Sequence, residues 1–426
     1  MIRVLLSLLI GIAYMSIQAQ VSYIHCGNLI DATSERVKSE QTIIIENNII
    51  KDIVNGFAEV PDTATLIDLS EHFVMPGFID MHVHIEGESS PGRYSEAFRL
   101  NKQDIALRAT QYCDRTLMAG FTTVRDMGGS GVNVSLRNAI NAGYISGPRI
   151  ITAEKAIGTT GGHADPTNGV NEDLIGDPGP KEGVINNVED ARKAVRQRYK
   201  NGADCIKITA TGGVLSVAKD GMGPQFTVEE VKAIVDAAND YGFISAAHAH
   251  GVEGMKRAVL GGITTIEHGT FMDTEVMDLM IKHGTYYVPT ISAGKFVFEK
   301  ATNEPFYFPA IIRPKALEVG PQIQETFAKA YKHGVKIAYG TDTGVSPHGQ
   351  NAREFTFMVE AGMPAIEAIL SATKIASEAL RMDDSIGSIV TGKKADIIAV
   401  KKNPLDDITV LQEMDFVMKD GAVYKQ

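Results

Sequence analysis

Eight short apolar runs, most of them separated by helical patterns, restrict the fold of this sequence more than any other feature. The clearest helical pattern begins at Thr227, which forms a capping box with Glu230 and is followed by apolar residues at helical spacing. The runs are residues 78–84, 121–126, 149–154, 205–210, 243–250, 264–269, 286–290 and 336–342. We expect an α/β fold, a (β/α)8 TIM barrel, although a doubly wound parallel sheet contains similar units.

Both ends of the chain have a different pattern, with short β segments joined by tight turns. The stretch QTIIIENNIIKDIV predicts two strands around an Asn-Asn turn. Near the other end, ADIIAVKK and DFVMKDGAVYKQ predict further strands. We therefore expect a small β-domain built from residues 20–75 and 385–426, next to a central barrel domain of residues 76–384.

The first 19 residues have the composition of a signal peptide. Arg3 precedes an apolar run from Val4 to about Tyr14, and small or polar residues follow up to Ala19. The apolar run is short for a membrane span. We expect residues 1–19 to be cleaved from a bacterial protein that is exported to the periplasm or secreted. An uncleaved anchor and a buried first strand are the alternatives.

The net charge narrows the classes of binding partner, and the cysteine content bears on disulfide bonds. The chain has 41 Lys and Arg against 52 Asp and Glu, a net charge of −11. This balance disfavours non-specific binding to nucleic acid or to an anionic membrane. Cys26, Cys113 and Cys205 are too few for a disulfide framework, so we expect buried small apolar side chains, with one pair left open.

Residues with metal-binding or acid–base chemistry stand where the apolar runs end. In a barrel, the carboxyl ends of the strands meet at one rim, so these side chains are expected to converge. Because strand side chains alternate, His82 and His84 point to one face, as do His248 and His250. Two such imidazoles can bind one divalent cation, and a hydrogen-bonded pair at a strand end is the alternative. His268 and Asp342 end two further runs.

Lys207 places an amine at the inward end of an otherwise apolar run. A buried, unpaired ammonium is costly, and such a lysine tends to lose its proton. A neutral amine can react with carbon dioxide to give a carbamate, an anionic ligand that can bridge two metals. The alternative is an ammonium paired with Asp342 or with a substrate carboxylate.

Five segments in this order, VMPGFIDMHVH, CIKITATGG, AAHAHG, TTIEHGT and YGTDTG, resemble the metal-dependent amidohydrolase superfamily. Within it the chain is similar to the prolidase-like group of Xaa-Pro dipeptidases and N-acyl-amino-acid carboxypeptidases, which is related to imidazolonepropionase. The resemblance covers nearly the whole chain after the leader. It includes IGSIVTGKKADIIAV, which implies that the two chain ends form a β-sandwich.

The resemblance implies a site for two divalent metal ions, with zinc as our first choice. One ion would be held by His82, His84 and Asp342, the second by His248 and His268, with Lys207 bridging both as N6-carboxylysine. A water between two such ions becomes a ready nucleophile. Asp342 would take its proton and pass it to the leaving nitrogen, acting as base and then as acid.

Two further histidines are candidates for substrate binding. His163 follows two glycines in GTTGGHADP, a loop that can approach a ligand closely, and His250 lies two residues after His248. Related dipeptidases use residues at these places to bind the α-carboxylate of the substrate. The alternative for each is a structural histidine.

We therefore expect a hydrolase that cleaves the amide bond of dipeptides, Xaa-Pro dipeptides among them, or of N-acyl amino acids, next to a free carboxylate. A metal-bridging hydroxide would be the nucleophile. Two alternatives remain: a hydrolase of a cyclic amide, lactone or amidine on the same fold, and a catalytically inactive binding protein. The expected partner is a small molecule or dipeptide, with no nucleic acid and no membrane in the mature form. A homo-oligomer is left open.

Overall fold

The computed structural model describes residues 21–96, 98–218 and 221–426. The predicted signal peptide, residues 1–19, lies outside these ranges and stays a prediction. Within the described ranges, we find no helix that is both long and apolar enough to cross a membrane.

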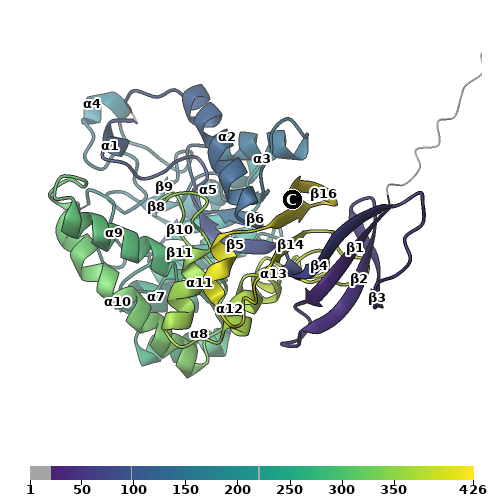
Figure 1. Ribbon diagram of the computed structural model, residues 1–426. Helices are drawn as coiled ribbons and strands as arrows, with labels where there is room; N and C mark the ends of the chain where they lie inside the picture. The colour runs from purple at the N-terminus through teal and green to yellow at the C-terminus, as the bar shows by residue number, and fades with distance from the viewer. Residues whose placement is uncertain (1–20, 97, 219–220) are drawn as a thin grey trace, which may run out of the picture.

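Strands from both ends of the chain share one seven-stranded sheet, which projects from the helical body in Figure 1. Its order is β16-β15-β14-β4-β1-β2-β3. The bounds are β1 Val21–Leu29, β2 Lys38–Glu46, β3 Ile49–Asn55, β4 Thr65–Pro76, β14 Ile397–Val400, β15 Phe416–Lys419 and β16 Ala422–Lys425. Antiparallel pairing of β4 with β14 joins the two chain ends. The two layers of a sandwich and the domain boundaries stay predictions.

The central part of the chain contains two parallel sheets, β5-β6-β7 and β10-β11-β12-β13. Their strands are β5 Phe78–Val83, β6 Phe121–Asp126, β7 Arg149–Thr152, β10 Ile206–Thr209, β11 Ser245–Ala249, β12 Thr265–His268 and β13 Tyr286–Val288. Seven of the eight predicted apolar runs therefore contain strands. A small parallel pair, β8 Gly158–Thr159 and β9 Val184–Ile185, lies in the connection between the sheets.

The eighth run, residues 336–342, forms one isolated bridge, between Ile337 and Tyr287, where a regular ladder was expected. On one side, the Ala338 N–H donates to the Tyr287 carbonyl of β13 at 2.9 Å. On the other side, the Met81 N–H of β5 donates to the Tyr339 carbonyl at 2.9 Å. This segment therefore links the two sheets and brings Asp342 next to β5.

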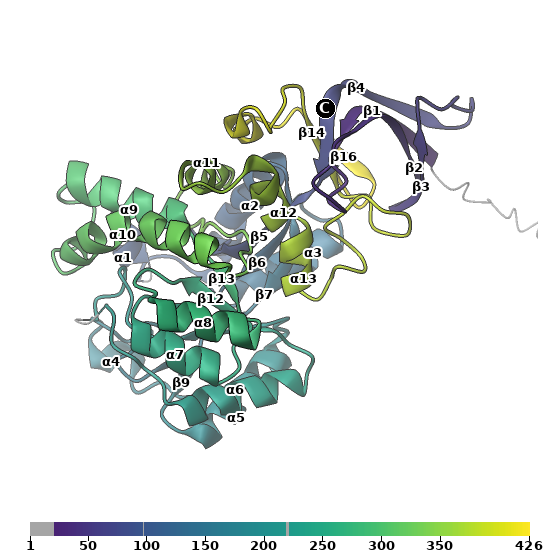
Figure 2. The same ribbon diagram turned by 90° about the horizontal axis from the view of Figure 1, so that it is seen from below.

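Helices lie outside the strands, as Figure 2 shows. Those of the first half are α1 Arg93–Glu96, α2 Lys102–Met118, α3 Val132–Asn141, α4 Glu172–Ile175, α5 Val188–Asn201 and α6 Val228–Asn239. Those of the second half are α7 Val252–Leu260, α8 Thr274–His283, α9 Ile291–Asn303, α10 Ile312–His333, α11 Arg353–Glu360, α12 Ala365–Ser371 and α13 Lys374–Ala379.

Helix α6 starts where its sequence predicts. The Thr227 side chain accepts a hydrogen bond from the Glu230 N–H, and the Glu230 carboxylate accepts one from the Thr227 N–H at 2.8 Å. These contacts satisfy backbone donors that an α-helix leaves unpaired in its first turn. The apolar stripe that contains Val231 and Ile234 is buried.

An aromatic cluster packs at the base of the strands that carry candidate ligands. The Phe355 ring of α11 lies 4.9 Å from the Phe78 ring of β5 and 4.3 Å from the Tyr339 ring, measured between centroids. All three side chains are fully buried. The three cysteines are also buried and free, which confirms the expectation of small apolar side chains.

We predict that Phe355→Ala lowers the free energy of unfolding by about 3–5 kcal/mol, because it leaves a cavity between β5 and residues 336–342. Phe306→Ala is the matched control, since the Phe306 side chain is 96% exposed, and its effect should stay within about 0.5 kcal/mol. Urea unfolding followed by circular dichroism measures both. Equal effects of the two substitutions would contradict this packing.

Candidate metal centre

The strand ends open into one cavity of about 630 Å³. All eight residues predicted to act in the site line it, namely His82, His84, His163, Lys207, His248, His250, His268 and Asp342. They come from the end of β5, from the loop after β8, and from the ends of β11, β12 and residues 336–342. Lys207, expected at a strand end, is instead the second residue of β10. The structure thus brings together residues that are up to 260 positions apart, from His82 to Asp342.

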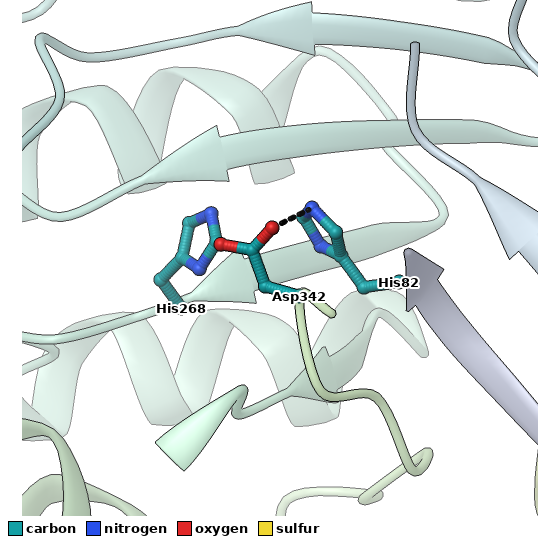
Figure 3. A group of neighbouring side chains, drawn as sticks. All are labelled: His82, His268 and Asp342. Carbon is teal, nitrogen blue, oxygen red and sulfur yellow. Dashed lines mark ion pairs between the residues drawn. The ribbon is translucent and has the colours of Figure 1, made fainter. Parts of the chain in front are cut away.

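Three of these side chains form the tightest group. The nearest ligand atoms of His82, His268 and Asp342 all lie within 4.8 Å of one another, and the side chains face each other in Figure 3. The Asp342 Oδ1 atom is 3.6 Å from His82 Nε2 and 3.5 Å from His84 Nε2. The Lys207 Nζ atom is 3.4 Å from His82 Nε2.

In three of these imidazoles, the Nδ1 atom lies within hydrogen-bond distance of a group outside the set of ligand candidates. His82 Nδ1 lies 2.8 Å from Glu267 Oε2, and His84 Nδ1 lies 2.7 Å from the Gly128 carbonyl oxygen. His268 Nδ1 lies 2.7 Å from Thr290 Oγ1. Because carboxylate and carbonyl oxygens only accept hydrogen bonds, the first two rings donate from Nδ1. This leaves the Nε2 lone pairs available to a cation.

Glu267, the partner of His82, also forms a fully buried ion pair with Arg125. The Glu267 Oε1 atom lies 2.8 Å from Arg125 Nη2, and both side chains are 0% exposed. Arg125 Nε also donates to the Met81 carbonyl at 2.7 Å, and Nη1 donates to Thr265 Oγ1 at 3.0 Å. A buried carboxylate that is paired in this way fixes the orientation of the imidazole it contacts.

The backbone is strained at two candidate ligands. His268 has φ 70° and Asp342 has φ 55°, in the left-handed region that residues other than glycine rarely adopt. Such conformations cost about 1–3 kcal/mol each and are concentrated at functional sites. At both positions the chain turns sharply at the rim, which aims the side chain into the cavity.

Burial shifts the pKa of the titratable side chains in the site. It lowers the pKa of His84 to about 3, and it lowers the pKa of His82 and His268 well below the ordinary value. The same cause lowers the pKa of Lys207 to about 8 and raises the pKa of Asp342 to about 7. Near neutral pH the imidazoles are therefore uncharged, the form in which histidine binds metals.

The donor set fits a divalent metal. Asp342 Oδ1 is buried and has no hydrogen-bond partner among the described residues. An orphaned buried carboxylate oxygen is costly, and a cation at this point would satisfy it. Imidazole nitrogens with a carboxylate oxygen are ligands that suit zinc and several other first-row metals.

The remaining histidines lie beside this group. His248 is bound through Nε2 to the Gly212 carbonyl at 3.0 Å, and its ring lies 4.6 Å from the His268 ring. The His163 ring lies 4.3 Å from His248, and His250 Nδ1 lies 2.8 Å from Thr270 Oγ1. His248 therefore lies directly beside His268, and the rings of His163 and His250 are its other neighbours.

Glu267 is a residue that sequence reasoning does not single out. It directly precedes His268, and its only signal is a carboxylate within the apolar run TTIEHG. Its contact with His82 joins residues that are 185 positions apart in the chain. Only the arrangement of the strands shows this contact.

The sequence profile of the Amidohydrolase family matches residues 73–424. This chain belongs to the amidohydrolase family. An ochratoxinase from Aspergillus niger is 33% identical, in an alignment that covers 96% of this chain and 87% of that protein.

Solved structures agree with this family membership. A Xaa-Pro dipeptidase, whose crystal structure has methionine bound in the active site, is 56% identical in sequence to this chain. The two structures have a TM-score of 0.93. That match covers 96% of this chain and 100% of the dipeptidase chain. A prolidase complexed with N-methylphosphonate-L-proline is 31% identical, with a TM-score of 0.86. It covers 96% of this chain and 100% of the prolidase chain. This amidohydrolase is thus a metal-dependent hydrolase of carbon–nitrogen bonds.

We predict that Glu267→Gln weakens metal binding by about 10- to 100-fold, because the amide no longer orients and polarises His82 as a carboxylate does. Competition with a chromogenic chelator measures the affinity directly. The control is Glu154→Gln, which changes another buried carboxylate paired with an arginine, Arg198, at 3.1 Å. That variant should lose stability and keep its metal affinity. Equal metal affinity in the Glu267→Gln and unmodified proteins would refute the orienting role.

Proposed function

We propose that this amidohydrolase cleaves the amide bond of dipeptides, Xaa-Pro dipeptides among them, or of N-acyl amino acids, next to a free carboxylate. The observation that carries the proposal is the convergence of six metal-ligand candidates and two substrate-binding candidates in one cavity. The similarity to a Xaa-Pro dipeptidase, 56% identical over 96% of this chain, supports the choice of substrate class.

The ligands divide into two groups around Lys207. We assign His82, His84 and Asp342 to one divalent ion and His248 and His268 to a second, with zinc as the first choice. Ions bound there supply Lewis acidity, which makes water nucleophilic near neutral pH. Asp342 lies beside both His82 and His84. From there its carboxylate takes a proton from the attacking water and returns it to the leaving nitrogen.

We propose that Lys207 carries a carbamate. The Lys207 Nζ and His82 Nε2 atoms face each other at 3.4 Å, and both side chains are buried. Burial lowers the pKa of the Lys207 ammonium to about 8, so the neutral, nucleophilic amine is accessible near neutral pH. The neutral amine attacks carbon dioxide, a nitrogen–carbon bond forms, and the amine proton leaves to solvent. The resulting N6-carboxylysine would offer its carboxylate oxygens as further ligands to divalent ions bound in the cavity.

His163 and His250 are proposed to contact the substrate. The His163 Nδ1 atom is buried and has no hydrogen-bond partner among the described residues. Gly213 leaves room for this ring, since a Cβ there would lie 2.3 Å from His163 Cε1. A substrate oxygen in the cavity would satisfy the unpaired nitrogen.

We further propose that the two parallel sheets form one (β/α)8 barrel and that the terminal sheet is the family's β-sandwich. Residues 336–342 supply the eighth strand between β13 and β5, in keeping with the hydrogen bonds on both sides. A single parallel bridge between Ile157 and Ile208 supports closure on the other side, between β7 and β10.

The second candidate function is the hydrolysis of a broader range of amide substrates. The ochratoxinase relative covers 96% of this chain at 33% identity. Beyond the metal ligands, the cavity is walled by apolar residues of α9, α10 and the loop before α10, including Val297, Phe308 and Val319. A bulky apolar acyl group would be compatible with this wall. Hydrolysis of a cyclic amide, lactone or amidine stays an untested alternative.

We predict about two divalent ions per chain after expression with zinc, measured by elemental analysis. Lys207→Ala should lower this content and abolish turnover, because it removes the bridging ligand. The control is Lys402→Ala, which changes an exposed lysine and should leave both unchanged. Full metal content and turnover in Lys207→Ala would exclude the carbamate.

A panel of dipeptides and N-acyl amino acids, each with a free or an amidated C-terminus, tests the substrate class. We predict turnover of the free acids with kcat/KM at least about tenfold above that of the amidated forms. This corresponds to about 1.4 kcal/mol of binding to the carboxylate. Equal turnover of free and amidated forms would contradict the proposed function and favour the broader specificity.

A further inference from the structure

Arg93 places a guanidinium at the edge of the cavity that holds the metal-ligand candidates. It begins α1, in the connection from β5 to α2, and it lines the same cavity as His84 and Asp342. A Cβ added to Gly87 would lie 2.8 Å from Arg93 Nη1. The guanidinium therefore lies against a glycine backbone only three residues after His84.

The short helix that carries Arg93 is tied down on both sides. The Tyr94 hydroxyl donates to the Leu215 carbonyl at 2.8 Å, which joins α1 to a loop on another wall of the cavity. Glu96 binds Arg108 of α2 through two hydrogen bonds of 2.7 and 2.8 Å. These contacts hold α1 at the cavity, although the Arg93 side chain itself is exposed.

The carboxylates around Arg93 are already bound elsewhere. Three glutamates stand on this connection, Glu86, Glu88 and Glu96. Glu86 accepts hydrogen bonds from the N–H groups of Ser130 and Asn133. Glu88 accepts from the His348 N–H and pairs with Arg115. Glu96 pairs with Arg108. Among the residues that the structure describes, none forms an ion pair with the Arg93 guanidinium. Its positive charge is therefore available to a ligand.

Another cation near the cavity is placed differently from Arg93. Lys315 donates to the carbonyls of Gly213, Ser216 and Ala218 at 2.7–3.0 Å, so its ammonium holds the loop that Tyr94 also contacts. His163 and His250, the carboxylate-binding candidates of the sequence, are buried beside His248. Arg93 thus adds a charged, exposed donor to the lining of the same cavity.

We propose that Arg93 binds the free carboxylate of the substrate and makes the enzyme specific for anionic substrates. This inference rests on the proposed function and adds Arg93 to His163 and His250 as a residue that recognises the carboxylate. A guanidinium offers donors in a planar fork that matches the two oxygens of a carboxylate. The apolar wall formed by residues such as Val297 and Phe308 accommodates the uncharged end of the same substrate.

The test uses the metal-loaded protein and compares binding with turnover. Calorimetry gives the affinity for L-proline and for L-prolinamide, and kinetics gives kcat/KM for N-acetyl-L-proline and its carboxamide. We expect Arg93→Ala to weaken proline binding and to lower kcat/KM for the free acid by about 10- to 100-fold, mainly through KM. This is the range of a charged hydrogen-bonded contact. The amide forms should be unaffected, and Arg93→Lys should restore part of the loss.

Arg99→Ala is the matched control, because Arg99 is exposed on the same connection and does not line the cavity. It should leave unchanged both the affinity for L-proline and the preference for the free acid over the amide. An Arg93→Ala protein that still prefers the free acid as strongly as the unmodified protein overturns the inference, and so does an unmodified protein that binds proline no better than prolinamide. Proline binding that depends on Arg93 without turnover of any amide supports the inference and counts against the proposed function.

Discussion

The candidate site depends on one buried chain of contacts, from Arg125 through Glu267 to His82. All three side chains are almost completely inaccessible to water, so the charges of Arg125 and Glu267 must neutralise each other. The pair fixes one ring nitrogen of His82, and the other nitrogen then faces Lys207 and Asp342. Because Arg125, Glu267 and His82 lie on β6, β12 and β5, the ligand geometry is set by how the two parallel sheets are arranged.

The same principle holds at the other ligands, where an imidazole is oriented by a group on a different element. Thr290 lies beside His268, and the Gly128 carbonyl lies beside His84. Thr290, like His268 and Asp342, adopts a positive φ. Strained backbone at three points of one rim is maintained only when the surrounding packing fixes it. Rigid packing below the rim, such as that around Phe355, therefore supports the chemistry above it.

The sequence predicts the ligand candidates because two simple rules apply to them. Side chains alternate along strands, and the carboxyl ends of parallel strands meet at one rim, so His82, His84 and Asp342 are expected to converge. Contacts between distant segments follow no such rule. The partner of His82, the isolated bridge of residues 336–342 and the free guanidinium of Arg93 depend on packing between elements, which a sequence pattern does not encode. The single sheet formed by both chain ends is likewise defined by its pairing, of which local strand signals give only the parts.

These contacts describe a cavity with the metal-ligand candidates on its floor, an apolar wall and a guanidinium at its edge. Anomalous diffraction from crystals grown with zinc tests this account most directly. The account predicts two peaks, one among His82, His84 and Asp342 and one between His248 and His268, with extra density on Lys207 Nζ. A single peak, or an unmodified Lys207 paired with Asp342, would contradict it.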